Sequence, residues 1–254
     1  MGKAVSALRL LVFYAFSAAL LSAVIVAVIV AVVIRPGKDL YYRVVRYWLS
    51  GILRIFGCEL VVEGAEHLTK GQDYVFLANH RSLLDPPAIA MAVMPQGTRW
   101  VAKQELRRVP IFGKALEMTG QIFIERKDTS RAIQALERHK HDQGAIIVFF
   151  PEGHRTEGRS LQPFKNGGAA FAIQAGLPVV PVAVTGTEIC LPTRSLQSRP
   201  GVIRVRIEVP ILTADFHFDQ RAELMARVEA RVKTMTTEME GTHPESEYNG
   251  NSNV

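Results

Sequence analysis

A histidine and an aspartate lie close together in the stretch ANHRSLLDPP, residues 78–87. A carboxylate beside an imidazole fixes its tautomer and stabilises the imidazolium, so His80 and Asp85 could act together as a general base. On one continuous helix, side chains with this spacing point about 140° apart and would not meet. Asp85 before Pro86 predicts instead a helix that starts there, with Asp85 as N-cap, after a turn that can bring the carboxylate back to His80. Taken alone, the stretch is also compatible with a capped helix beside an incidental histidine.

Two other stretches put charged residues at the predicted ends of strands. FPEGHRT, residues 150–156, follows a run of apolar residues, and the carboxyl end of a strand is where open parallel sheets bind ligands. There Gly153 allows close approach of the backbone, and Arg155 can hold a phosphate through two hydrogen bonds. GQIFIERK, residues 120–127, also ends in cations that suit a phosphate dianion, with Arg126 the first of them. Each stretch alone is weak, because ordinary strands often end in solvated charges.

From residue 58 the sequence alternates between strand-like and helical segments, which predicts an α/β fold with a mainly parallel sheet flanked by helices. Segments rich in β-branched and aromatic residues predict strands at 59–64, 74–79, 98–103, 121–125, 145–150, 179–184 and 202–209. Helices are predicted at 86–94, 128–140, 164–176 and 219–239. On the last of these helices, Leu224, Val228 and Val232 share one face. Pro178 and Pro181 favour an edge or irregular position for the strand at 179–184.

A long uncharged segment, Leu10–Ile34, precedes this domain. Its 25 residues would form a helix about 37 Å long, enough to cross a hydrocarbon core of about 30 Å. We therefore predict an N-terminal membrane-anchoring helical segment. Lys3 and Arg9 suggest a signal peptide as the alternative, but the apolar run exceeds the usual length of such a segment. A buried core helix is disfavoured by the same length.

The next stretch, residues 40–57, has the pattern of an amphipathic helix. Arginines lie mostly off an apolar stripe that recurs at every fourth position: Leu40, Val44, Trp48, Ile52 and Phe56. We expect an interfacial helix on a membrane, with packing of the stripe against the protein core as the alternative. Basic residues flank the apolar segment on both sides, so a full span and a hairpin dipping into one leaflet both stay open. The expected organisation is an anchor at 1–57, an α/β domain at 58–240 and a disordered tail at 241–254.

Composition limits the classes of partner and cofactor. The net charge is +6, yet dense Lys/Arg runs and RNA-binding motifs are missing, so nucleic acid is not an expected partner. The basic balance fits anionic lipid or a phosphorylated substrate better. Cys58 and Cys190 lack metal-ligand spacing and the seven histidines are scattered, so we predict no metal site and no redox cofactor.

Four blocks, in this order along the chain, resemble those of the glycerolipid acyltransferase family. They are NHxSxxD at 79–85, GxxFIxR at 120–126, FPEGxR at 150–155 and LPVVPVAV at 177–184. The resemblance spans residues 40–212, is nearest to the bacterial 1-acyl-sn-glycerol-3-phosphate acyltransferases, and fits the apolar N-terminal segment. His154 stands where the family commonly has threonine, a departure that bears on substrate detail more than on reaction type.

The resemblance implies transfer of an acyl chain from an acyl thioester to the sn-2 hydroxyl of 1-acyl-sn-glycerol-3-phosphate (lysophosphatidic acid), giving phosphatidic acid. His80 would be the general base, and Asp85 would orient it. Two supporting residues and five residues that hold the glycerol phosphate are implied: Asn79 and Ser82, and Lys103, Arg126, Glu152, Gly153 and Arg155. The donor would be acyl-CoA or an acyl carrier protein thioester. The protein would lie at a bacterial inner membrane, with its catalytic domain facing the cytoplasm.

Alternatives remain for both substrate and class. The acceptor could be a different lysolipid. A membrane-bound lipid hydrolase would use Ser82 as nucleophile with His80 and Asp85, but the GxSxG nucleophile elbow is missing from the sequence. An inactive, membrane-anchored lipid-binding protein would be expected to have lost the His–Asp pair.

Overall fold

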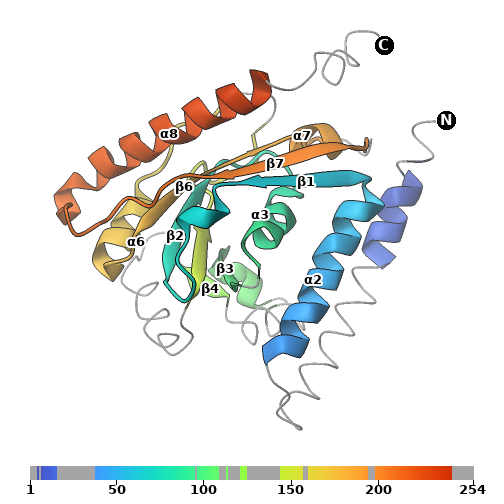
Figure 1. The fold of residues 1–254 in the computed structure, drawn as a ribbon, viewed down its shortest axis with the longest axis horizontal. Coiled ribbons are helices and arrows are strands. Elements are labelled where there is room, and N and C mark those ends of the chain that lie inside the picture. Colours follow the sequence, from blue (N-terminus) through green and yellow to red (C-terminus); the bar gives the residue numbers. More distant parts are fainter. Residues whose placement is uncertain are drawn as a thin grey trace.

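The computed structural model describes residues 5, 7–15, 38–94, 96–108, 113, 121–124, 144–156, 160–193 and 198–241. Within these residues seven strands form one sheet in the order β1-β7-β6-β2-β5-β3-β4 (Figure 1). Their bounds are β1 Cys58–Glu63, β2 Tyr74–Ala78, β3 Thr98–Lys103, β4 Ile122–Ile124, β5 Ile146–Phe149, β6 Val179–Thr185 and β7 Gly201–Ile207. All seven predicted strands are therefore confirmed.

The sheet is mainly parallel, as predicted. Strands β6, β2, β5, β3 and β4 run in the same direction, while β7 is antiparallel to β6, and β1 is parallel to β7. The carboxyl ends of the five parallel strands therefore lie at one edge of the sheet. In open sheets of this kind, the loops at that edge form the ligand site.

Helices cover both faces of the sheet (Figure 1). Their bounds are α2 Lys38–Ile55, α3 Asp85–Val93, α6 Gly167–Ala175, α7 Thr187–Cys190 and α8 Arg221–Gly241, and residues 7–15 are also helical apart from these. Strand β2 shows the alternation that this layering requires. Tyr74 and Phe76 pack with side chains of α2 and α3, whereas Val75 and Leu77 pack with those of α6 and α8. Two apolar layers therefore hold the sheet between helices.

The prediction that β6 is an edge or irregular strand is wrong. All seven of its residues are buried, and it lies between β7 and β2. Pairing with β7 starts only at Val182, opposite Ile207, so Pro181 lies just beyond the end of that ladder. Its carbonyl accepts a hydrogen bond from the backbone N–H of Glu208, 3.0 Å away. A central strand can hold a proline there because the missing N–H removes only the one bond that would extend this ladder by a residue.

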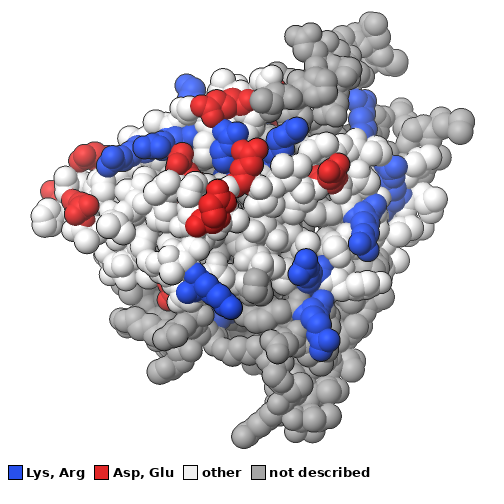
Figure 2. All heavy atoms as spheres, viewed as in Figure 1, with Lys and Arg blue, Asp and Glu red and all other residues white. Residues whose placement is uncertain are grey.

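Helix α2 packs against the domain through its C-terminal half. Leu49, Ile52, Leu53 and Phe56 are buried, and the helix contacts α3 and β1. Of the two interpretations of this stretch, packing against the core therefore holds for this half. Arginines of α2 remain exposed on the outer side, and Figure 2 shows blue side chains gathered over this helix.

Of the remaining sequence predictions, some are confirmed and others lie outside the described residues. Helices α3, α6 and α8 confirm three predicted helices, and Leu224, Val228 and Val232 of α8 are buried as expected. The predicted helix at 128–140, most of the apolar segment and nearly all of the C-terminal tail lie outside the described residues. In the part of the chain that is described, no helix combines the length and the apolar character needed to span a membrane.

Candidate active site

His80 and Asp85 meet in the turn between β2 and α3. The imidazole Nδ1 lies 2.8 Å from Asp85 Oδ2. The contact predicted from the spacing is therefore present. An ionised carboxylate can only accept hydrogen bonds, so Nδ1 carries the proton and Nε2 carries the lone pair.

Asp85 is the first residue of α3, so the helix starts one residue earlier than predicted, and Leu84 is the N-cap. The physical reason lies in the residues that follow Asp85. With Asp85 as N-cap, the second helical residue would be Pro87, which has no N–H to give, and the N–H of the third, Ala88, is bonded to the Leu84 carbonyl at 3.1 Å. The Asp85 carboxylate is therefore free to turn back to the loop before the helix.

Four donors hold the Asp85 carboxylate, which is fully buried. Oδ2 accepts hydrogen bonds from the backbone N–H groups of Arg81 at 2.7 Å and Ser82 at 2.8 Å, besides the His80 imidazole. Oδ1 accepts a hydrogen bond from the Thr187 hydroxyl at 2.5 Å. The Thr187 contact joins positions 102 apart in the chain, and no sequence pattern indicated it.

A second contact, stacking on one face of the ring, also fixes the His80 imidazole. It stacks on Phe150 with the ring centroids 4.0 Å apart, and Phe150 in turn stacks on Trp100 at 5.9 Å. The His80 side chain is 17% exposed, so the ring is held on one edge and one face yet stays accessible. Because Nδ1 is engaged by Asp85, the ring is oriented to use Nε2.

Asn79 joins β2 to β6 beyond the end of their ladder. Its Nδ2 donates to the Val184 carbonyl and its Oδ1 accepts the Val184 N–H, each at 2.8 Å. The amide therefore continues the backbone pairing by one more residue. Both polar atoms of the side chain are used in this way, which supports a positioning role over contact with a reacting carbonyl.

Glu152, after the end of β5, holds the loop between β2 and α3, residues 79–84, which we call the histidine loop. Its Oε1 accepts the His80 backbone N–H at 2.7 Å, and its Oε2 accepts the Gln162 N–H at 3.1 Å. The side chain is almost completely buried. The Thr156 N–H donates to the His80 carbonyl at 3.0 Å from the same loop. The backbone on either side of the imidazole is thus fixed from the next strand of the sheet.

Ser82 faces away from the imidazole chemistry. Its hydroxyl donates to the Leu191 carbonyl at 2.7 Å and accepts the Leu84 N–H at 3.2 Å, and the residue is fully buried. A nucleophilic serine must give its proton to the histidine base. Here the Ser82 hydroxyl donates its proton to the Leu191 carbonyl and not to His80, so the geometry counts against a Ser–His–Asp triad.

Three of the five residues implied for the phosphate lie in or beside the loop after β5, at the same edge of the sheet. Arg155 is exposed. Gly153 has φ +80°, and a Cβ there would lie 2.6 Å from Lys165 Nζ, so a side chain at this position would meet the lysine. Lys103 is the last residue of β3 and ends at the same edge, although its side chain, like all of Arg126, lies outside the described residues.

Lys165 is a cation of this site that the sequence interpretation missed. Its backbone N–H donates to the Pro151 carbonyl at 3.1 Å, and its side chain lies across Gly153. The side chain is exposed, and the structure shows no carboxylate partner for it among the described residues. A lysine two residues before the pair of glycines that start α6 was the available signal.

A buried ion cluster lies behind the histidine loop. The Arg81 guanidinium is fully buried and contacts Glu240 of α8 at 2.5 Å and Glu188 of α7 at 3.4 Å. Burial raises the pKa of Glu188 above its ordinary value of 4.5, against the opposing attraction of Arg81, and the nearby Asp85 and Glu240 charges raise it further. The cluster thus joins the histidine loop to the last helix.

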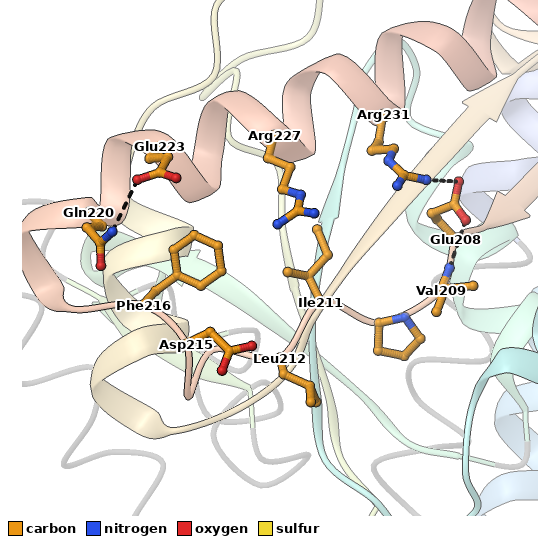
Figure 3. Close-up of a pocket in the computed structure, with 11 residues that line it drawn as sticks. Glu208, Val209, Ile211, Leu212, Asp215, Phe216, Gln220, Glu223, Arg227 and Arg231 are labelled. Carbon is orange, nitrogen blue, oxygen red and sulfur yellow. Dashed lines mark hydrogen bonds and ion pairs between the residues drawn. The ribbon is translucent and has the colours of Figure 1, made fainter.

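The hollow shown in Figure 3 is a different feature. It is a groove of about 480 Å³ between α8 and the segment that follows β7, with Arg227 and Phe216 among its lining residues. Basic, acidic and apolar side chains are mixed along it. None of its lining residues belongs to the His80 site, so we assign it no part in the chemistry.

Comparisons with known proteins agree on one family. A model of the family described as Acyltransferase matches residues 59–185, which include β2, the His80–Asp85 turn and β6. The 1-acyl-sn-glycerol-3-phosphate acyltransferase of Cocos nucifera is 34% identical over 186 residues, covering 72% of this chain and 58% of that protein. The protein of the same name from Salmonella typhimurium is 32% identical over 179 residues, covering 69% of this chain and 72% of that protein.

The fold comparison is equally extensive. The crystal structure of the 1-acyl-sn-glycerophosphate (LPA) acyltransferase from Thermotoga maritima aligns with a TM-score of 0.78 at 24% identity, over 96% of this chain and 100% of that one. The match to the Cocos nucifera relative spans less than two thirds of that protein's length, at 58%. Family membership rests on the family match and on identities above 30% across more than two thirds of the chain. The chain belongs to the acyltransferase family.

Proposed function

We propose that the protein transfers an acyl chain from an acyl thioester to the sn-2 hydroxyl of 1-acyl-sn-glycerol-3-phosphate, giving phosphatidic acid. The observation that carries the proposal is the orientation of His80, whose Nδ1 is held by Asp85 so that Nε2 is left to accept a proton. The two relatives above carry the name of this activity. The use of the Ser82 hydroxyl within the loop favours direct transfer over an acyl-enzyme route.

The proposed step needs one base and no covalent intermediate. His80 Nε2 takes the proton of the acceptor hydroxyl as that oxygen attacks the thioester carbonyl carbon. The tetrahedral intermediate collapses with cleavage of the C–S bond, and the departing thiolate takes the proton back from the imidazolium. Asp85 stabilises the imidazolium between these events, because its carboxylate stays ionised and in place. The products are the ester and a free thiol, and no metal or cofactor enters the balance.

The phosphate of the acceptor would be held by cations at the carboxyl edge of the sheet. Arg155 and Lys165 flank the loop after β5, and we propose Lys103 and Arg126 as further contacts from the ends of β3 and β4. Cations at this edge suit a phosphate dianion. Glu152 is better suited to positioning than to substrate binding, because both carboxylate oxygens hold backbone N–H groups.

We further propose that the protein works at a membrane surface, in bacteria the cytoplasmic face of the inner membrane. The acceptor and product are lipids, and the uncharged segment at 10–34 has the composition of an anchor. The exposed arginines of α2 suit anionic head groups. Acyl-CoA and acyl carrier protein thioesters are both candidate donors.

A direct assay tests the proposed function. The purified full chain in detergent is given 1-acyl-sn-glycerol-3-phosphate together with acyl-CoA or an acyl carrier protein thioester, and other lysolipids serve as competing acceptors. We expect phosphatidic acid and free thiol in equal amounts. Release of free fatty acid without phosphatidic acid would favour the hydrolase, and a strong preference for another lysolipid would reassign the acceptor.

Removing a cation at the loop after β5 should weaken acceptor binding. Lys165→Ala is expected to raise KM for lysophosphatidic acid about tenfold, because a charge-assisted contact to the phosphate is lost. Initial rates at varied acceptor and fixed donor give this value. KM for the acyl donor should stay within about twofold.

The matched control for Lys165→Ala is Lys70→Ala. Lys70 is an exposed lysine before the amino end of β2, away from the edge that carries the site. Its replacement should leave both KM values unchanged. An equal rise of both KM values in Lys165→Ala would contradict a contact to the acceptor phosphate.

A further inference from the structure

We propose that Thr187 is a positioning residue for the His80–Asp85 pair, an inference that rests on the proposed acyl transfer. The Thr187 hydroxyl donates to Asp85 Oδ1, the oxygen opposite the one that holds the imidazole. Thr187 does not reach the reacting atoms itself. It fixes the rotation of the carboxylate, and the carboxylate fixes the imidazole.

The division of donors on Asp85 gives Thr187 its importance. Oδ2 accepts three hydrogen bonds, two of them from backbone N–H groups of the histidine loop itself. Those two donors would move together with that loop. Thr187 instead comes from α7, after β6, and among the described residues it is the one donor that reaches Oδ1 from outside the loop. Because Asp85 and Thr187 are both fully buried, water cannot replace this hydroxyl.

The hydroxyl proton is directed to Asp85 and not to its neighbour. Thr187 Oγ1 also lies 3.4 Å from Glu188 Oε2, a longer contact than the 2.5 Å to Asp85. A hydroxyl has a single proton, so the shorter contact takes it. Glu188 has a partner of its own in Arg81.

The backbone before Thr187 is fixed by close packing. Gly186 has φ +86°, and a Cβ there would lie 2.1 Å from the Val202 carbonyl oxygen of β7. Only glycine fits this approach. The end of β6 therefore delivers Thr187 at one place relative to the histidine loop, which a rigid positioning contact requires.

Two pairs of variants separate the hydroxyl from the packing of the side chain. Thr187→Val keeps the shape and removes the hydroxyl, and Thr187→Ser against Thr187→Ala isolates the same hydroxyl without the methyl group. Thr185→Val is the matched control, since Thr185 is equally buried on β6 and its hydroxyl has no hydrogen-bond partner among the described residues. Each full-length variant is assayed for phosphatidic acid formation, and its thermal unfolding is recorded.

We expect kcat to fall about 10- to 100-fold in Thr187→Val, with KM for both substrates within about twofold. The kcat of Thr187→Ser should stay within about threefold of the parent value. It should exceed the kcat of Thr187→Ala by the same factor by which the parent exceeds Thr187→Val. Thr185→Val should match the parent. If Thr187→Val does not fold, the Ser and Ala pair decides the question.

Equal kcat in the Ser and Ala variants, or a parent-like kcat in Thr187→Val, would overturn the inference. The inference is also overturned if kcat falls only in step with thermal stability, and does so equally in Thr187→Ser and Thr187→Ala, because that result shows a structural role. A folded parent that forms no phosphatidic acid would instead count against the proposed function. The two failures are therefore distinguishable.

Discussion

Replacing His80 by alanine is expected to lower kcat for phosphatidic acid formation about 10²- to 10⁴-fold, the range that a general base contributes. The imidazole is held by Asp85 at 2.8 Å and by the stacked Phe150 ring, so its Nε2 is the group oriented to take the acceptor proton. KM for lysophosphatidic acid should stay within about threefold, because the phosphate contacts proposed here lie on other residues. Steady-state rates of the purified variant over a range of acceptor concentrations give both constants.

Ser82→Ala is the control on the same turn. Its hydroxyl holds the Leu191 carbonyl and the Leu84 N–H, so its removal should loosen the loop and cost less than about tenfold in kcat. Thermal unfolding of His80→Ala should show a folded protein, since Asp85 keeps three of its donors. Parent-like turnover in His80→Ala would remove the proposed base, and loss of all turnover in Ser82→Ala with a trapped acyl-enzyme in the parent would establish the hydrolase mechanism.

The parts of the site that the sequence could predict are those with local causes. His80 and Asp85 meet because a turn lies between them and a helix with two prolines in its first turn starts at Asp85, and both signals are within eight residues. The strands could be predicted because β-branched residues and turn residues alternate along the chain. Periodicity also placed the buried face of α8.

The parts that could not be predicted are contacts between distant segments. Thr187 and Glu240 reach the histidine loop from positions 102 and 159 residues away from their partners there, and neither contact follows a repeat. The rule that prolines mark edge strands failed at Pro181, because this proline lies just beyond the end of the ladder with β7, where a missing N–H leaves the paired residues intact. Glu152 was assigned to the substrate from the family resemblance, whereas in the structure it is buried and turned toward backbone N–H groups.

These distant contacts share one function, which is to hold a short loop rigid from several directions. The end of β5 holds it through Glu152, the end of β6 through Asn79 and Thr187, and α8 through the Arg81 cluster. A catalytic group gains from such support because a small misplacement of a reacting atom costs orders of magnitude in rate. The fold contributes to the proposed chemistry mainly through this support.

Replacing Arg81 by methionine is expected to lower the free energy of unfolding by about 3–5 kcal/mol, a large part of the total for a domain of this size. The change leaves the Glu188 and Glu240 carboxylates largely buried, with side-chain exposures of 12% and 14%, and without the cation between them. Urea unfolding in detergent, followed by the fluorescence of Trp48 and Trp100, measures the loss.

The loss should depend on pH with a definite sign. Burial already raises the pKa of Glu188, and removal of Arg81 takes away the main opposing attraction, so the folded-state pKa rises further. A carboxyl with a raised pKa is protonated in both states below its unfolded value of about 4.5, and it destabilises the fold as pH rises through the folded value. The difference between Arg81→Met and the parent should therefore be smaller near pH 5 than near pH 8.

Arg206→Met is the matched control, because Arg206 also contacts two carboxylates, those of Glu63 and Glu238, each at 2.7 Å. These partners are 47% and 60% exposed, so water can replace the cation, and the loss should stay below about 1 kcal/mol.

Adding Glu188→Gln and Glu240→Gln to Arg81→Met should restore much of the stability, since no buried charge is then left alone. Equal losses of unfolding free energy in Arg81→Met and Arg206→Met, or no recovery in the triple variant, would contradict the prediction. Either result would mean that the ion pairs of Arg81 with Glu188 and Glu240 do not hold the histidine loop.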